Sequence, residues 1–248
     1  MSKMKITSEE SPMAAKPNRR QRLACVLEDV GNTLQFMADA GCRGFECRAS
    51  HQDMVRKWGA RGLRHTESLK DIHGDLGDCK RCGLSKERTK IVFGDGCEQA
   101  RLVFVGEGPG YEEDKQGKPF VGAAGKLLVK ILEAMHLSRE DVYICNIVKC
   151  RPPNNRNPKP EEISTCIPFL ERQIRAINPE FICALGKFAA QTLLQTDVPI
   201  SRLRGTFHTY HGIPVMPTYH PAYLLRNPAS KRDVWNDMQQ LMKCMGLC

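Results

Sequence analysis

Six glycines and two prolines crowd a stretch between two apolar runs, VGEGPGYEEDKQGKPFVGAAG at residues 105–125. A backbone with so few side chains can come close to a bound ligand. The stretch also carries three consecutive acids at residues 112–114. Because like charges repel, these acids argue against a pyrophosphate as that ligand. We therefore expect the segment to contact a flat, neutral group.

Two common phosphate-binding motifs fail in the same stretch. The dinucleotide fingerprint G-x-G-x-x-G matches at Gly106 and Gly108, but Tyr111 stands where the third glycine is needed. A P-loop fails as well, because no Gly-Lys-Ser or Gly-Lys-Thr follows at the required spacing. Both exclusions favour a ligand other than a nucleotide phosphate.

Four cysteines form a candidate metal site. Cys79 and Cys82 make a CKRC sequence, a spacing shared by zinc, redox and iron–sulfur sites. The charged residues between the thiols, and the lack of a preceding strand, disfavour a redox pair. Cys150 and Cys166 are the best further ligands, because they border a segment rich in Pro and Asn, residues 151–165, that cannot be a regular strand. Spacing alone leaves zinc and iron–sulfur open.

The chain has twelve cysteines in all. Cys25, Cys145 and Cys183 lie in apolar stretches and are expected to be core thiols. Cys244 and Cys248 fall on a terminal helix and tail, and we do not expect them to bind metal. Many cysteines without a secretory signal indicate a reducing compartment, so we expect a cytoplasmic protein of bacterial type.

Charge suggests a partner. The 37 Lys and Arg residues outnumber the 28 Asp and Glu residues, which gives a net charge of +9. A basic protein suits a polyanion such as nucleic acid, although a merely basic surface is the simpler alternative. No run of eighteen apolar residues occurs, so we expect no membrane span.

Strands and helices alternate along most of the chain. Apolar patterns predict strands at 100–107, 141–150 and 179–186, and a strand pair about Gly212. Helical spacing predicts helices at 123–137, 157–178, 187–196 and 230–245. This alternation predicts an α/β fold, with a parallel sheet covered by helices on both faces.

The first part of the chain has a different character. Residues 1–20 are polar and are expected to be disordered. Helical spacing predicts a helix at 22–41, and a basic stretch without clear period follows to residue 67. We expect an N-terminal extension, 1–70, whose role the sequence does not reveal, and a folded domain at 71–248.

Three motifs carry a resemblance to a known family. GEGPGYEED…GKPFVGAAG, NIVKCRPPNNR and HPAYLLRNP, together with the four cysteines, resemble the motifs of family 4 uracil-DNA glycosylases, the iron–sulfur branch of their superfamily. The resemblance covers roughly residues 70–246. It implies a three-layer α/β/α fold with a central, mainly parallel four-stranded sheet. It also implies hydrolysis of the bond between uracil and DNA sugar, in base excision repair, and a 4Fe-4S cluster on the four cysteines.

The resemblance assigns roles in a uracil pocket. The glycine-rich loop, with Gly106 and Gly108, would hold a uracil flipped out of the DNA. Phe120 would stack on the base, and the Asn146 amide would recognise its edge. His220 would stabilise the negative charge that develops on uracil O2.

Two positions depart from the best-known branch of the superfamily. Gly108 stands where that branch has Asp, so we assign water positioning or cation stabilisation to Glu107, the nearest carboxylate. Gly110 stands where that branch has the Tyr that excludes the thymine methyl group. In family 4 a later acid has that task, and it corresponds to Glu113.

A third motif is expected to meet the DNA. Leu224 or Leu225, in a loop after Pro221, would fill the gap left by the flipped base, and Arg226 would contact a phosphate. A leucine pair in the core is the simpler alternative. The cluster would hold the segment 150–166 and present nearby basic residues to DNA; these are Lys80, Arg81, Arg151 and Arg156.

Two competing functions remain at this point. One is a DNA- or RNA-binding iron–sulfur module of the same fold without catalysis. The other is a redox protein that uses its cluster for electron transfer. The resemblance favours the enzyme, a monomer acting on uracil in single- or double-stranded DNA, and it leaves protein partners unknown.

Overall fold

The computed structural model describes Val30 and residues 67–247. The chain divides into two compact units, Met1–Arg64 and His65–Cys248. The predicted helix at 22–41 lies outside the described residues apart from Val30. The predicted domain boundary at residue 71 falls inside the first helix of the second unit, which Ser68 caps by accepting the backbone N–H of Asp71.

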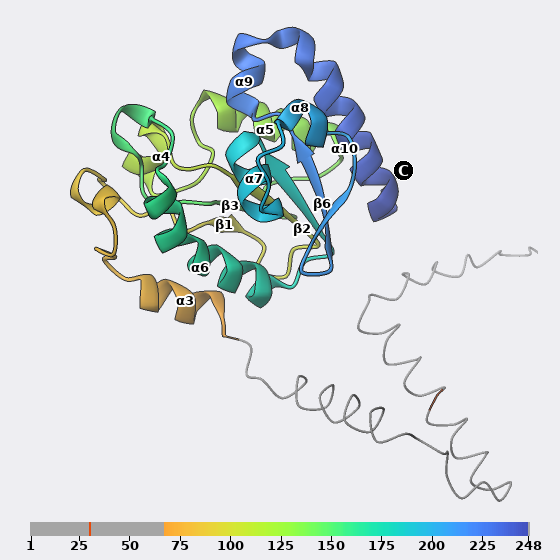
Figure 1. Cartoon of the computed structure of the whole chain (residues 1–248). Helices are drawn as coiled ribbons and strands as arrows, with labels where there is room; N and C mark the ends of the chain where they lie inside the picture. Colours follow the sequence, from red (N-terminus) through yellow and green to blue (C-terminus); the bar gives the residue numbers. More distant parts are fainter. Residues whose placement is uncertain (1–29, 31–66, 248) are drawn as a thin grey trace, which may run out of the picture. The chain divides into compact units, whose positions relative to one another are not determined.

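A mixed sheet of six strands forms the centre of the second unit (Figure 1). Its strands, in chain order, are β1 (Asp95–Gly96), β2 (Leu102–Gly106), β3 (Tyr143–Asn146), β4 (Phe181–Leu185), β5 (His208–Tyr210) and β6 (Ile213–Thr218). The spatial order is β1-β3-β2-β4-β6-β5, and the four inner strands are parallel.

The α/β fold is confirmed, and the four-stranded parallel sheet needs one correction. The parallel strands β3, β2, β4 and β6 are present, but β1 and β5 add an antiparallel strand at each edge. The β5–β6 pair turns at His211 and Gly212, both with positive φ, as a tight hairpin requires. The two-residue β1 leaves too little apolar pattern to be recognised in the sequence.

Helices cover both faces of the sheet. They are α3 (Leu69–Leu76), α4 (Tyr111–Gln116), α5 (Ala123–Ala134), α6 (Pro160–Ile177), α7 (Lys187–Leu194), α8 (Ile200–Leu203), α9 (Pro221–Arg226) and α10 (Lys231–Met245). Three single turns of 3-10 helix lie at Gly83–Lys86, Pro153–Asn155 and Pro228–Ser230. None of the described helices is long and apolar enough to cross a membrane.

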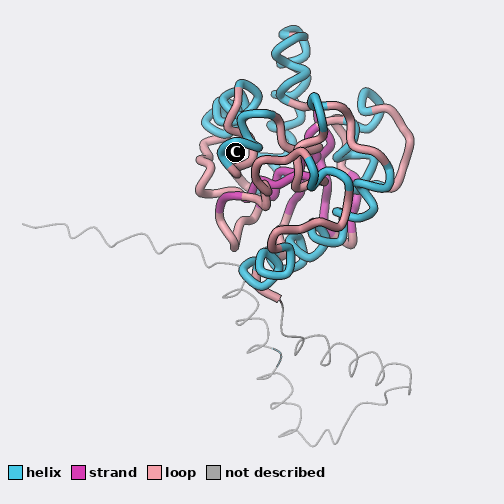
Figure 2. Tube along the Cα trace, turned by 90° about the vertical axis from the view of Figure 1, so that its left-hand side faces the viewer, coloured by secondary structure: helices cyan, strands magenta, loops and turns pink. Residues whose placement is uncertain are grey.

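Alternate side chains of β2 define two cores. Val103 and Val105 pack with residues of α3, α6, α7 and α8, whereas Leu102 and Phe104 pack with residues of α5, α9 and α10. The alternation follows from the two-residue period of a strand. All five residues of β2 are buried, as expected for a central strand between two helical layers. The strands lie between helices in the rotated view as well (Figure 2).

Two segments expected as loops are short helices. Glu112, Glu113 and Asp114 occupy the first turn of α4, where negative charge favours a helix. Pro221 begins α9, a position that suits proline, and the His220 side chain caps it. Helices this short carry too few residues to show a period in the sequence.

Candidate active site

The carboxyl ends of the parallel strands meet at one edge of the sheet, where ligands bind in open α/β folds. Gly106 and Asn146 end β2 and β3 and are register partners. Glu107 follows Gly106 directly, and His220 follows the end of β6 by two residues. The topology therefore brings these four predicted site residues to the same edge.

Gly106 is bare because two side chains lie against it. A Cβ atom at this position would be 2.4 Å from Asn146 Oδ1 and 2.8 Å from both Cε2 and Cζ of Phe120. Any larger residue would displace the amide or the ring. The glycine thus lets an aromatic ring and an amide, far apart in the sequence, share one small space.

The amide of Asn146 has an unused acceptor. Its side chain is 2% exposed, and Oδ1 has no hydrogen-bond partner among the described residues. A buried, unpaired polar atom costs about 1–3 kcal/mol. Such atoms are rare, and this one lies beside an aromatic ring at a sheet edge. The arrangement suits a planar ligand that donates an N–H to Oδ1.

Phe120 is held in an uncommon backbone conformation. Its φ is 52°, in the left-handed region that bulky residues rarely adopt, and the side chain is 6% exposed. Arg139 fixes this turn by donating to the carbonyls of Pro119 and Phe120, both at 2.8 Å. Gly125 leaves room for the turn, since a Cβ there would be 2.0 Å from the Phe120 oxygen.

His220 presents one nitrogen to the site. Its Nδ1 accepts the backbone N–H of Ala222 at 3.1 Å, so in the neutral ring the proton sits on Nε2. Burial lowers the pKa of His220 to about 4, with Glu113 opposing and Arg226 adding to the shift. The ring lies 5.5 Å from that of Phe120, centroid to centroid. At neutral pH it is an uncharged hydrogen-bond donor.

Glu107 is the acid at this edge with a strongly raised pKa. Burial raises the pKa of its carboxyl to about 7, and no charged neighbour contributes to the shift. Its backbone carbonyl accepts the N–H of Val148 at 3.1 Å, which fixes the start of the loop. A carboxylate with this pKa can accept a proton near neutrality, as a general base must.

The acids of α4 differ in surroundings. Glu113 Oε1 accepts the backbone N–H groups of Val121 and Gly122, both at 2.9 Å, and so holds the turn that carries Phe120. Its other oxygen, Oε2, would lie 2.8 Å from a Cβ at Gly110. Glu113 is therefore a fixed part of the pocket wall rather than a solvated charge.

The other two acids of α4, Asp114 and Glu112, differ from Glu113 in their surroundings. Asp114 is 3% exposed and accepts the backbone N–H groups of Thr89 and Lys90, at 2.8 and 3.3 Å. Glu112 is exposed. The sequence did not reveal the role of Asp114, because its partners lie about 25 residues away along the chain.

The residues expected to meet DNA lie on α9 and not in a loop. Consecutive residues of a helix point about 100° apart, so the leucine pair is divided. Leu224 is 1% exposed and packs in the core, whereas Leu225 is 47% exposed and Arg226 is exposed. The expectation that Leu224 enters DNA is therefore wrong, and Leu225 alone is available.

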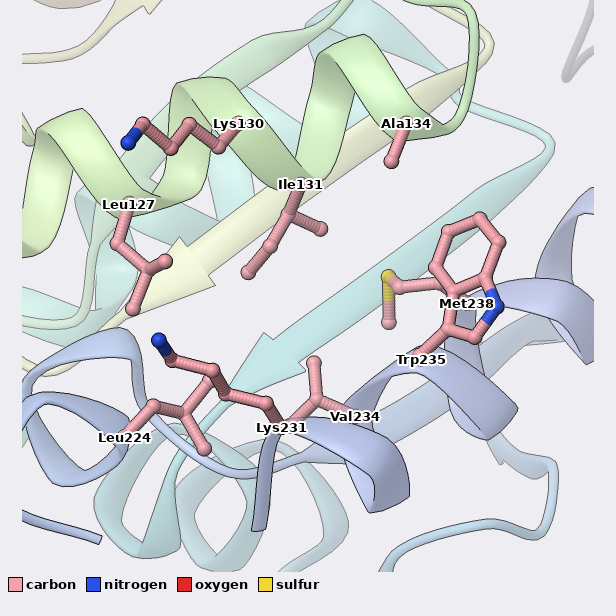
Figure 3. A pocket seen from close by; sticks show the side chains of 9 residues that line it. All are labelled: Leu127, Lys130, Ile131, Ala134, Leu224, Lys231, Val234, Trp235 and Met238. Atoms are coloured by element: carbon pink, nitrogen blue, oxygen red, sulfur yellow. The ribbon is translucent and has the colours of Figure 1, made fainter. Parts of the chain in front are cut away.

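A separate cavity lies between α5 and α10, with one residue of α9 in its wall (Figure 3). It has a volume of about 240 Å³ and is lined by Leu127, Lys130, Ile131, Ala134, Leu224, Lys231, Val234, Trp235 and Met238. Its wall is apolar apart from two lysines, and none of the pocket residues described above lines it. We conclude that it is not the candidate active site.

The four predicted ligand cysteines share one neighbourhood. The charges of Cys82 and Cys166 act on Cys150, and those of Cys79 and Cys82 act on Cys166. Burial raises the pKa of Cys150 to about 12 and that of Cys166 in the same direction. The four thiols therefore lie close enough for their charges to act on one another.

Hydrogen-bond donors surround these sulfur atoms. Arg81 donates to Cys79 Sγ at 3.4 Å, Arg88 to Cys150 Sγ at 3.5 Å, and the backbone N–H of Lys149 to Cys166 Sγ at 3.3 Å. Such donors stabilise negatively charged sulfur. In the described part of the chain no three His, Cys, Asp or Glu side chains converge on a single ion.

The structure tests the predictions for some of the other cysteines. Cys145 and Cys183 are 1% and 0% exposed, which confirms them as core thiols. Cys244 is exposed on α10. Cys25 and Cys248 lie outside the described residues.

Comparison with known proteins agrees with this geometry. A family model described as the uracil DNA glycosylase superfamily matches residues 93–239, more than half of the chain. The type-4 uracil-DNA glycosylase of Archaeoglobus fulgidus is 44% identical over 188 residues, which are 73% of this chain and 94% of that protein.

The chain belongs to the type-4 uracil-DNA glycosylase family. Two further members are similar to it. The protein from Thermotoga maritima is 50% identical over 166 residues, 65% of this chain and 86% of its own. The protein from Saccharolobus solfataricus is 42% identical over 188 residues, 72% of this chain and 87% of its own.

A buried lysine links the thiols to the pocket of this family member. Lys149 is 0% exposed, and its Nζ donates to the carbonyl of Asn146 at 2.8 Å and to Gln173 Oε1 at 2.5 Å. Its own N–H donates to Cys166. Sequence reasoning missed this residue, although a lysine within the apolar run NIVKC was a usable signal.

The raised pKa of Glu107 predicts a pH-dependent cost in stability. The folded state holds the proton up to about pH 7, whereas an ordinary Glu releases it near 4.5. The stabilisation that the folded state gains by holding this proton is therefore fully present below pH 4.5 and is lost as the pH rises to 7. We expect Glu107→Gln to be more stable than the parent above pH 7 and equal to it below pH 4.5, by urea unfolding. Equal stability at every pH would contradict a buried carboxyl.

Proposed function

We propose that this protein hydrolyses the N-glycosidic bond of uracil in DNA and releases free uracil, leaving an abasic site. The observation that carries the proposal is the unpaired Oδ1 of Asn146, buried beside the ring of Phe120. A flipped base enters such a pocket only if the pocket returns the energy of unstacking, a few kcal/mol. Stacking on an aromatic ring supplies about 1–3 kcal/mol of that.

Asn146 selects the base by its hydrogen-bonding edge. Its Oδ1 accepts the N3 proton of uracil, and its Nδ2 donates to O4. Cytosine presents an acceptor at N3 and a donor at N4, the opposite pattern. A matched bidentate pair is worth about 1–3 kcal/mol of discrimination. The contact from Lys149 to the Asn146 carbonyl keeps the amide in place.

His220 and Glu107 act on opposite charges of the transition state. As the bond from C1′ to N1 breaks, its electron pair moves onto the uracil ring and O2. The Nε2–H of His220 donates to that oxygen, as in an oxyanion hole. The sugar becomes oxocarbenium-like, and the Glu107 carboxylate stabilises it. A water oxygen then bonds to C1′ and gives its proton to Glu107.

Two residues extend this pocket. Glu113 is held by the N–H groups of Val121 and Gly122 beside Gly110. We assign to it the exclusion of the thymine methyl group. On the DNA side, Leu225 fills the gap left by the flipped base, and Arg226 contacts a phosphate. We take the monomer as the working unit.

The four thiols and their N–H donors fit a 4Fe-4S cluster, held by Cys79, Cys82, Cys150 and Cys166. When bound, the cluster holds the segment 150–166 against the rest of the fold, and hydrolysis needs no electron from it. Cross-linking such a long segment restricts the unfolded chain in the way that a metal site does. In this structural role the cluster differs from one in an electron-transfer protein, which must gain and lose electrons.

The first test is uracil release. The purified protein is incubated with a labelled oligonucleotide that bears one uracil, and hot alkali then cleaves abasic sites. We expect cleavage at uracil only, with none in matched oligonucleotides bearing thymine or cytosine. Asn146→Ala should lower kcat/KM about 10- to 100-fold, by loss of the edge contacts. Intact, cluster-loaded protein that releases no uracil would favour a non-catalytic binding module.

The buried lysine gives a second prediction. Lys149→Met keeps the volume of the side chain but leaves the Asn146 carbonyl unpaired, so we expect about a 10-fold lower kcat/KM. The visible absorbance of the cluster should remain. Lys243→Met, at an exposed position in the last turn of α10, is the control and should change neither quantity. If the visible absorbance and kcat/KM of Lys149→Met fall together, Lys149 acts by stabilising the cysteine segment and not by holding Asn146.

The cluster gives a third prediction. Cys79→Ser removes one thiolate, so we expect loss of iron and of the visible absorbance, a lower melting temperature and weaker DNA binding together. Cys244→Ser, at an exposed position on α10, is the matched control and should behave as the parent. Full stability and normal DNA binding in Cys79→Ser would contradict the structural role.

A further inference from the structure

An exposed tyrosine lies at the rim of the pocket. Tyr111 begins α4 directly after Gly110, and 52% of its surface is exposed. Two cations lie over its ring, with Lys115 Nζ at 5.6 Å and Arg151 Cζ at 5.1 Å from the centroid. An exposed aromatic ring flanked by positive charge is the composition of a surface that binds single-stranded nucleic acid.

Among the described residues, no acid forms an ion pair with Arg151. Four basic residues near the cysteines were expected to meet DNA, and three of them form ion pairs: Lys80 with Asp78, Arg81 with Asp75 and Arg156 with Glu162. Within the described residues Arg151 instead donates to the neutral Asn155 Oδ1 at 2.7 Å and lies over Tyr111. No ion pair is formed by Lys115 in the same part of the chain, and its side chain is exposed.

Packing fixes this surface next to the base pocket. A Cβ at Gly108 would be 2.7 Å from Val148 Cγ2 and 3.8 Å from Pro152 Cδ, so the glycine-rich loop rests on the segment that carries Arg151. The same loop leads from Glu107 to Tyr111 in four residues. A nucleotide bound at Tyr111 is therefore a close neighbour of the flipped base.

We propose that Tyr111, Lys115 and Arg151 form a binding site for a nucleotide that flanks the uracil, with the base on the ring and the phosphates on the two cations. This inference rests on the proposed function and deepens it. A base can stack on Tyr111 only when it leaves the stack of its own strand. In a duplex that base stays paired and stacked, so the site commits the protein to single-stranded DNA as its preferred substrate.

A cycle of variants in the protein and in the DNA tests the contact. The flanking base on either side of the uracil is removed by placing tetrahydrofuran, which resists alkali, at that nucleotide. We expect Tyr111→Ala to lower kcat/KM on the single strand roughly 5- to 150-fold. Removing the base on one side should cost the parent a similar factor and cost Tyr111→Ala almost nothing. Tyr111→Phe, which keeps the ring, should behave as the parent.

Two further readouts separate the proposal from its rivals. The loss in Tyr111→Ala should be smaller on a duplex, and Arg151→Met should reduce the salt dependence of binding by about one ion. The Tyr111→Ala substitution and the removal of the flanking base could instead lower kcat/KM independently, or Tyr111→Ala could cost the same factor on the single strand and on the duplex. Either result would mean that the ring only packs against the two cations. A parent protein that releases no uracil would instead remove the proposed function itself.

Discussion

The site depends on the close contact at Gly106. Because this residue has no Cβ, the Phe120 ring and the Asn146 amide both lie against the end of β2. The same closeness leaves Asn146 Oδ1 without a partner among the described residues, at a cost in stability. A ring that donates an N–H to this oxygen would recover that cost. Recognition and strain are therefore two consequences of one missing side chain.

The surrounding structure holds this contact from three sides. Glu113 and Arg139 bind the backbone that gives Phe120 its left-handed conformation. Lys149 holds the carbonyl of Asn146 and reaches the thiol of Cys166 through its N–H. The first turn of α9 fixes the tautomer of His220, because the Ala222 N–H donates to its Nδ1. Arg139 and Lys149 thus hold the site through backbone carbonyls, and neither charge contacts the Phe120 ring or the Asn146 amide directly.

Much of this followed from the sequence, because it depends on local pattern. Periodicity predicted the parallel strands and long helices, and the motifs predicted Glu107, Asn146 and His220, which the topology brings to one edge. The buried roles of Asp114 and Lys149 did not follow, since Thr89, which Asp114 binds, and Gln173, which accepts from Lys149, each lie about 25 residues away along the chain. Leu224 was misjudged because α9 is too short to show a period, and its burial depends on packing against other helices. The roles of all three residues depend on contacts between segments that are far apart in the sequence.

The most direct measurement is inhibition of uracil release by free uracil and by 3-methyluracil. The two compounds have the same ring and carbonyls, but the second has a methyl group in place of the N3 proton. If the unpaired Oδ1 of Asn146 recognises the base, uracil inhibits and 3-methyluracil does not, and Asn146→Ala removes the difference. Equal inhibition of the parent protein by both compounds would contradict the account.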